Sequence, residues 1–146
     1  MSVEQRGTVS DTDPSAYKQW STINLRYGDT DRQGHINNAV YCTLYESGRV
    51  DFLFSTDGDS VAGAGTAFVI AKLALDYLKE MHFPGDVKVG SKILSIGRSS
   101  FRVGQAIFYK DQCCSTAESV IVVIDPDTNK SIPIPDTLRR VLEKIL

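Results

Sequence analysis

Hydrophobic and polar residues follow two different periods along the chain, and these divide it into predicted strands and helices. Between residues 19 and 27 apolar side chains alternate with polar ones, which is typical of a strand. The side chains expected to share its apolar face are Ile23, Leu25 and Tyr27. Residues 29–38 are polar and predict a loop. The next apolar positions recur at helical spacing, so we expect a largely buried helix at about 38–54, with Asn37 as its N-cap.

The apolar residues of segment 66–81 fit both the period of a helix and the period of a strand. One set of their apolar side chains forms the stripe of an amphipathic helix, and another set alternates as on the face of a strand. Intrinsic propensity favours the helix. The pattern by itself therefore leaves the two structures open.

The rest of the chain predicts an antiparallel meander and a final helix. Strands are expected to begin at Val87 and to cover 101–109 and 117–124, with turns at "GRSS" and "KDQ". The strand at 117–124 is apolar on both faces, which predicts a central place in the sheet. Asp136 is expected to cap a short C-terminal helix. One strand, a buried helix and a run of strands make an α+β order.

Composition and charge limit the class of protein. The 146 residues, 42% of them hydrophobic, suffice for one domain with a core, which we place at 17–146 after a loose polar tail over 1–16. A net charge of −2 gives no reason to expect nucleic-acid binding. No apolar run reaches membrane-spanning length and no signal peptide is recognisable, so we expect a cytoplasmic protein. Cys42, Cys113 and Cys114 lack the spacing of a disulfide or zinc site and are expected to be free thiols.

The loop "DTDRQGHINN", residues 29–38, is unusually rich in carboxylate, amide and imidazole groups. A calcium-binding EF-hand is one explanation to test, because Asp29, Asp31 and Gly34 fit its first, third and sixth positions. However, Val40 stands at the twelfth position, where the bidentate glutamate is required, and no helix is expected before the loop. The calcium explanation is therefore not favoured.

The segment "RYGDTDRQGHINNAVYCTLYESGRVDF", Arg26 to Phe52, resembles the signature of acyl-CoA thioesterases of the 4-hydroxybenzoyl-CoA thioesterase type. The matching positions are Asp31, Gly34, His35, Asn37, Asn38, Tyr41, Glu46 and Arg49. The element order extends the resemblance over about residues 18–135. It implies the hotdog fold, an α+β architecture in which an antiparallel sheet wraps around a central helix. It also implies a strand, and not a helix, at 67–79.

The resemblance assigns roles to residues of the loop. It makes Asp31 the catalytic carboxylate, acting as nucleophile or general base, and the backbone N–H of Asn38 the oxyanion donor. A helix N-terminus suits the second role because its first N–H groups are unpaired. Asp29 matches a second acidic position of such motifs and would have a supporting role at the substrate, and Gly34 would let the backbone approach the substrate. The ordinary alternative for Asp31 is an Asx-turn or a cap.

The remaining candidates would contact substrate or structure. Substrate contact has a structural alternative at three of them: a hydrogen bond within the loop for His35, a helix cap for Asn37, and a place in the core for Tyr41. For Glu46, an ion pair with Arg49 is the alternative to a catalytic role. The expected contacts for the coenzyme A phosphates are Arg98, Ser99 and Ser100. No metal or separate cofactor is expected, because coenzyme A is part of the acyl-CoA substrate. Hotdog relatives pair edge to edge, which implies a homodimer or homotetramer.

Two other functions remain open on the sequence. A hotdog dehydratase or hydratase acting on hydroxyacyl thioesters would use His35 and Glu46 as acid and base, but it would leave Asp31 without a role. A non-catalytic acyl-CoA-binding module is the second alternative, because fold alone does not fix function. Acyl chain length and the preference for aryl or alkyl groups are not determined by the sequence.

Overall fold

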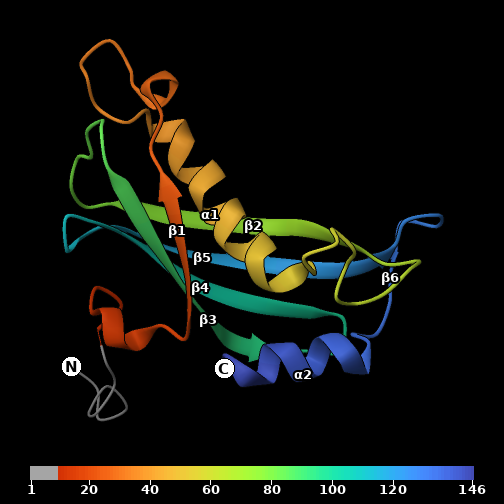
Figure 1. Ribbon diagram of the computed structural model, residues 1–146. Coiled ribbons are helices and arrows are strands. Elements are labelled where there is room, and N and C mark those ends of the chain that lie inside the picture. Colours follow the sequence, from red (N-terminus) through yellow and green to blue (C-terminus); the bar gives the residue numbers. More distant parts are fainter. Residues whose placement is uncertain (1–9) are drawn as a thin grey trace.

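The computed structural model describes residues 10–146, which form one curled antiparallel sheet with α1 on its concave side (Figure 1). The strand order is β1-β3-β4-β5-β2, and β6 pairs antiparallel with the end of β5. The elements are η2 (Pro14–Ala16), β1 (Gln19–Asn24), η3 (Tyr27–Asp29), α1 (Asn38–Leu53), β2 (Ala67–Tyr77), β3 (Asp86–Ile96), β4 (Ser100–Tyr109), β5 (Gln112–Asp125), β6 (Lys130–Ser131) and α2 (Asp136–Lys144). This is the hotdog fold, as the resemblance implied.

Residues 67–77 form strand β2, so the helix favoured by propensity is absent from this segment. β2 pairs with β5 from Ala67, opposite Ile124, to Tyr77, opposite Ser115. This long ladder outweighs a weak local preference. β2 lies at one end of the strand order and carries apolar side chains that remain exposed, among them Ile70 and Tyr77.

Two local predictions were wrong. The first strand ends at Asn24, and Tyr27 lies 78% exposed in η3, because hydrogen bonds between Arg26 and Asp29 turn the chain away from the sheet. At the other end of the chain, Pro135 occupies the N-cap of α2 and Asp136 is its first residue. The Asp136 carboxylate still lies in the first turn, where it favours the helix dipole.

The predicted meander is confirmed, with one change of position. β3, β4 and β5 pair in sequence, and β5 is an interior strand between β4 and β2. The middle of the five-strand order belongs to β4, although 117–124 was predicted to be central. Of the predicted tail, residues 1–9 lie outside the described part of the chain. Residues 14–16 form η2, and Tyr17 is buried against Phe108 on the sheet.

The predicted central helix is present, and it packs closely on the sheet at Gly48. A Cβ atom added there would lie 2.8 Å from Val89 Cγ1 and 2.9 Å from Gln105 Nε2. Gln105 is buried and donates hydrogen bonds to the Tyr45 carbonyl and to Ser91. The helix and the two strands β3 and β4 are therefore held together both by packing and by a buried amide.

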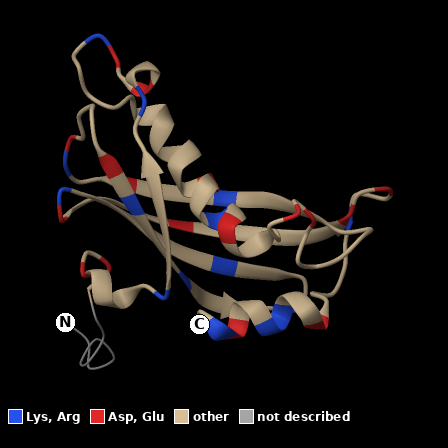
Figure 2. Cartoon of the chain, in the orientation of Figure 1, with Lys and Arg blue, Asp and Glu red and all other residues tan. Residues whose placement is uncertain are grey.

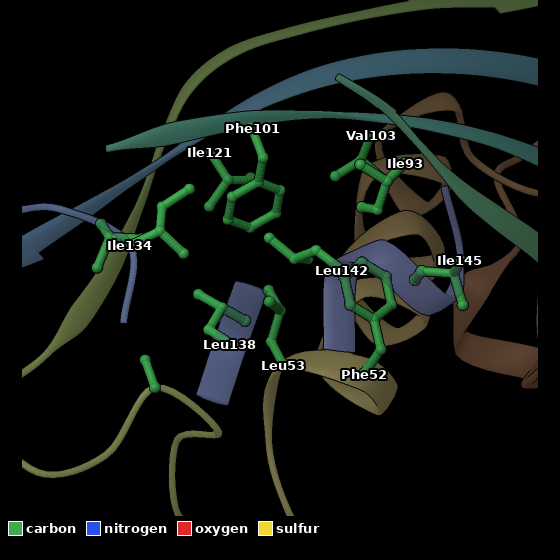
Figure 3. Close-up of a cluster of buried hydrophobic side chains, with 12 residues drawn as sticks. Phe52, Leu53, Ile93, Phe101, Val103, Ile121, Ile134, Leu138, Leu142 and Ile145 are labelled. Carbon is green, nitrogen blue, oxygen red and sulfur yellow. The ribbon is translucent and has the colours of Figure 1, made fainter. Parts of the chain in front are cut away.

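Two separate apolar clusters hold the two ends of α1. At its C-terminal end, Leu138 and Leu142 of α2 point toward Phe101 and Ile121 of the sheet (Figure 3). The other members of this cluster are Phe52, Leu53, Ala62, Ile93, Val103, Val123, Ile134 and Ile145. At the N-terminal end, the cluster contains three tyrosines, Tyr41, Tyr45 and Tyr109, and lies beneath the 29–37 loop. The C-terminal helix is thus part of the core.

Charged residues of both signs alternate in the loops and along α2 (Figure 2). Within residues 10–146, no helix is long and apolar enough to cross a membrane.

Candidate active site

The loop before α1 is a small hairpin held by backbone hydrogen bonds. Thr30 and Ile36 form an antiparallel bridge. The Asp31 N–H donates to the His35 carbonyl at 2.8 Å, and the N–H of Asn37 donates to the carbonyl of Asp29, also at 2.8 Å. Gly34 has φ +82°, so its lack of a side chain allows the turn at the tip. The polar residues of this segment are therefore held in one fixed conformation beside the start of α1.

Asp29 supports the loop from within. Its side chain is buried and accepts hydrogen bonds from the backbone N–H and the guanidinium of Arg26, each at 2.8 Å for the shortest contact. Burial raises the pKa of the Asp29 carboxyl, but the hydrogen bonds and charge of Arg26 outweigh it and leave the pKa below its ordinary value. The Asp29 carboxylate is thus paired with Arg26 within the loop.

Asp31 lies at the turn of the hairpin and is half-buried. Its Oδ1 atom accepts the backbone N–H groups of Gln33 at 2.9 Å and His35 at 3.1 Å. The Asx-turn that competed with a catalytic role is therefore present. It engages one carboxylate oxygen, and within residues 10–146 no hydrogen bond reaches the other, Oδ2. The turn orients the carboxylate and leaves one oxygen available.

At the start of α1 the backbone N–H of Asn38 is available. Asn37 is the N-cap, as predicted, and its side chain accepts the Ala39 N–H at 3.0 Å. The Val40 N–H donates to the Asn37 carbonyl at 2.9 Å, while the Asn37 N–H is already bound to Asp29. Among the described residues, no acceptor is found for the N–H of Asn38. The free donor is therefore the one that the resemblance assigned to the oxyanion.

Asn38 also lines a pocket of about 180 Å³ at the start of α1. The other lining residues are His35, Ile36, Tyr41, Tyr77, Leu78, Lys79 and Glu80. The Tyr77 hydroxyl donates to the Asn38 carbonyl at 2.9 Å, and the Tyr41 hydroxyl donates to the Lys79 carbonyl at 3.3 Å. Burial raises the pKa of Tyr41 to about 12, with smaller contributions from nearby thiol, phenol and carboxylate groups. This phenol therefore stays protonated and acts as a donor.

A family model agrees with this arrangement of loop, helix and sheet. The model of the thioesterase-like superfamily matches residues 25–142, which include the loop, α1 and every strand after it. The chain belongs to this superfamily.

Three solved structures have folds similar to that of this chain. A predicted thioesterase from Bacillus stearothermophilus is 31% identical, with a TM-score of 0.79 over 88% of this chain and 96% of that one. DHNA-CoA thioesterase from Staphylococcus aureus is 28% identical, with a TM-score of 0.71 over 79% of each chain. A thioesterase from Thermus thermophilus, complexed with coenzyme A and Zn, is 23% identical, with a TM-score of 0.72 over 86% of this chain and 98% of that one.

Glu46, part of the superfamily resemblance, lies away from the loop. It lines a second pocket of about 430 Å³ between α1 and β2, together with Arg49 and apolar residues such as Phe68 and Ile70. Within residues 10–146, no ion pair joins Glu46 to Arg49. Arg49 is buried and donates to Gln105 Oε1 at 3.3 Å, and burial lowers the pKa of its guanidinium. Glu46 and His35 therefore line different pockets of one chain.

The proposed phosphate contacts are not beside the loop of the same chain. Arg98, Ser99 and Ser100 lie at the turn between β3 and β4, next to α2, where the Ile134 N–H donates to the Arg98 carbonyl. The loop lies at the opposite end of β3, because the Leu25 N–H donates to the Gly85 carbonyl. Eleven residues of β3 separate the two ends by about 33 Å.

Sequence reasoning missed two residues near the loop, Glu80 and His82. Both lie on the connection between β2 and β3, and their side chains meet His35. The available signal was that this connection contains the second of only two histidines in the chain, two positions after a glutamate. The distance of more than forty positions from His35 hid the contact.

The three cysteines are free, as predicted. Burial raises the pKa of Cys113 and of Cys114, which keeps both thiols protonated at neutral pH. Cys42 is exposed on α1.

Proposed function

We propose that the chain hydrolyses an acyl- or aroyl-CoA thioester to the free acid and coenzyme A. The observation that carries the proposal is the unpaired N–H of Asn38, a residue that lines a pocket beside the hairpin that carries Asp31. Membership of the thioesterase-like superfamily supports thioester hydrolysis as the reaction class. The coenzyme A of the Thermus relative and the CoA thioester of the Staphylococcus relative support the substrate class.

In this mechanism the thioester carbonyl oxygen accepts a hydrogen bond from the Asn38 N–H. Negative charge develops on that oxygen in the transition state, and the start of a helix favours it. Asp31 Oδ2 either attacks the carbonyl carbon or removes a proton from an attacking water molecule. The coenzyme A thiol, with an ordinary thiol pKa of about 8.5, leaves without a strong acid.

The acyl group would occupy the pocket between α1 and β2. Glu46 follows Asn38 by eight positions on the helix, which corresponds to about 12 Å along its axis. A chain that starts at the Asn38 N–H and runs along α1 therefore reaches the 430 Å³ pocket. Its apolar lining of Phe68, Ile70 and Leu53 suits a hydrocarbon or aromatic group.

A second copy of the chain would complete the site through β2. An edge strand with exposed Val69 and Ile70 favours pairing with another strand. Antiparallel pairing of two β2 strands about a two-fold axis places the start of one beside the end of the other. The 97–100 turn lies two strand spacings, about 10 Å, from the start of β2, because Val123 bonds Ser99 and pairs with Phe68. Such a dimer would bring the turn of one copy toward the Asn38 pocket of the other.

The experiment compares Asp31→Asn with the unmodified chain in an assay that measures thiol release from a panel of acyl-CoA substrates. The substitution keeps the size and the Asx-turn acceptor but removes the charge. We expect kcat to fall by about 10²- to 10⁴-fold with KM little changed, which is the pattern of an interaction made in the transition state. Asp57→Asn, an exposed position in the connector after α1, is the matched control.

Hydrolysis by Asp31→Asn at the rate of the parent chain would contradict the mechanism. Glu46→Gln separates thioesterase from dehydratase, because only the dehydratase requires Glu46. Dehydration of a hydroxyacyl-CoA without thiol release, abolished in Glu46→Gln and unaffected in Asp31→Asn, would identify the dehydratase as the correct function.

Complementation between two inactive chains tests the assembly. Asp31→Asn and Arg98→Glu, each expected to have little activity alone, are co-refolded as mixed dimers. If one copy supplies Asp31 and the other Arg98, one of the two sites in each mixed dimer is intact. We expect activity to return in the mixture, and continued inactivity of a verified mixed dimer would reject the shared site.

A further inference from the structure

Three potential metal ligands meet where the hairpin touches the connection between β2 and β3. His35 comes from the hairpin, and Glu80 and His82 come from the connection. Glu80 Oε2 lies 3.1 Å from His35 Nε2 and 3.7 Å from His82 Nε2. All three ligand atoms lie within 4.8 Å of one another. Both imidazoles therefore face the same carboxylate oxygen.

These separations are close to those of a tetrahedral zinc site. Zn²⁺ binds imidazole nitrogen and carboxylate oxygen at about 2.0–2.2 Å, so two of its ligand atoms are about 3.3–3.5 Å apart. The two distances to Glu80 bracket this value. The remaining pair, the two imidazoles, lies within 4.8 Å, and the side chains of Glu80 and His82 are more than half exposed and can adjust to an ion.

The backbone holds the two histidines in place. His35 and His82 form an isolated antiparallel bridge, and beside it the Ile36 N–H donates to the Met81 carbonyl at 2.8 Å. The rings meet edge to face, with centroids 5.0 Å apart. This arrangement holds the two histidines side by side before any ion binds, which reduces the entropy lost on binding.

The hydrogen bond of His82 favours the tautomer in which Nε2 is free to bind a metal. His82 Nδ1–H donates to the Gly34 carbonyl at 3.2 Å, which leaves the lone pair of a neutral ring on Nε2, the atom that faces Glu80. Metal-binding histidines commonly donate their other N–H to a backbone carbonyl in this way. The neighbouring cation, Lys79, is directed elsewhere, since its ammonium donates to Gln112 Oε1 at 3.1 Å.

We propose that His35, Glu80 and His82 bind a zinc-type divalent ion through two imidazole nitrogens and one carboxylate. Two histidines and a glutamate leave the fourth position of a tetrahedral ion open to water or another ligand. His35 and Glu80 also line the 180 Å³ pocket, so the ion would lie in the wall of that pocket. It would tie the hairpin that carries Asp31 to the β2–β3 connection. Binding of the ion does not require that the chain hydrolyse thioesters.

Calorimetric titration of the chelator-treated chain with ZnCl₂ tests the site. We expect one ion per chain and a rise in Tm of the zinc-loaded protein. His82→Gln and Glu80→Gln should each weaken the affinity by at least about tenfold, because even the loss of an orienting partner costs 10- to 100-fold. Glu143→Gln, which makes the same charge change on the exposed surface of α2, is the matched control and should bind as the parent does.

Two spectroscopic measurements make the result specific. The chain has only two histidines, so NMR resolves both imidazoles, and Nε2 of each should shift when Zn²⁺ is added. With Co²⁺ as substitute, the absorption spectrum should lack the charge-transfer band of a thiolate ligand. A thiolate band, or parental zinc affinity in a folded His82→Gln chain, would overturn the proposal. Thiol release from acyl-CoA is measured separately, so zinc binding and hydrolysis can each fail alone.

Discussion

The two ends of α1 differ in what surrounds them. At Leu53 the helix ends in an apolar cluster that α2 closes, and Leu138 and Leu142 are fully buried there (Figure 3). At Asn38 the helix begins beside a polar hairpin, a free N–H group and a pocket. A helix firmly packed at one end can keep unpaired polar groups at the other, because its position does not depend on them. A closed apolar surrounding and an open polar one thus lie at opposite ends of one element.

The largest change in stability is expected from a substitution at the C-terminal end of α1, which α2 covers. Leu142→Ala removes a fully buried side chain from the α2 cluster, and the loss of contacts and the resulting cavity should lower the free energy of unfolding by about 2–5 kcal/mol. Urea unfolding followed by circular dichroism measures it. Thiol release per folded molecule should stay at the parental level. A large fall in kcat at full folding would show that the two ends are not separable.

A smaller effect is expected midway along the helix. Gly48→Ala places a methyl group 2.8 Å from Val89 Cγ1, and the forced movement should cost about 1–3 kcal/mol. Gly28→Ala is the matched control, because a Cβ there meets nothing within 4 Å, and it should change stability by less than about 0.5 kcal/mol. Equal stability of the two variants would show that α1 is not closely packed on the sheet.

The smallest change in stability is expected in the loop before the N-terminal end of α1, and it depends on pH. Folding lowers the pKa of Asp29 below its ordinary value of 3.8, so its stabilising contribution is present above that pH and is lost as pH falls through the folded pKa. Asp29→Asn should lower stability at neutral pH by about 1 kcal/mol, because the charge of the largely exposed Arg26 is screened by solvent. The difference from the parent should shrink below about pH 4, and a constant difference down to pH 2 would contradict this.

The helix and the loop could be predicted from the sequence because their signals are local. The cap at Asn37, the spacing of apolar residues after it and the glycine of the hairpin all lie within one short segment. β2 could not be assigned by its period. As an edge strand it exposes apolar side chains on both faces, and its structure is set by pairing with β5, which is distant in sequence.

The site was predictable only in part, for the same reason. Asp31, which the hairpin holds, and Asn38, the first residue of α1, both follow from a continuous motif. The position of Arg98 depends on the direction in which β3 runs, which turns alone do not reveal. The meeting of His35 with His82 depends on a single bridge between distant segments. Contacts between distant segments leave no periodic pattern in the sequence, so they are seen only in the folded chain.

The placement of α2 has a consequence for biosynthesis. α2 follows in the chain every strand against which it packs, so a ribosome makes it after the surface it covers. Until then Phe101 and Ile121 lack the side chains that bury them, and the growing chain exposes an apolar surface of the kind that chaperones bind. Slow translation of the segment before Asp136 would therefore prolong exposure, whereas slow translation of the 29–37 hairpin would not.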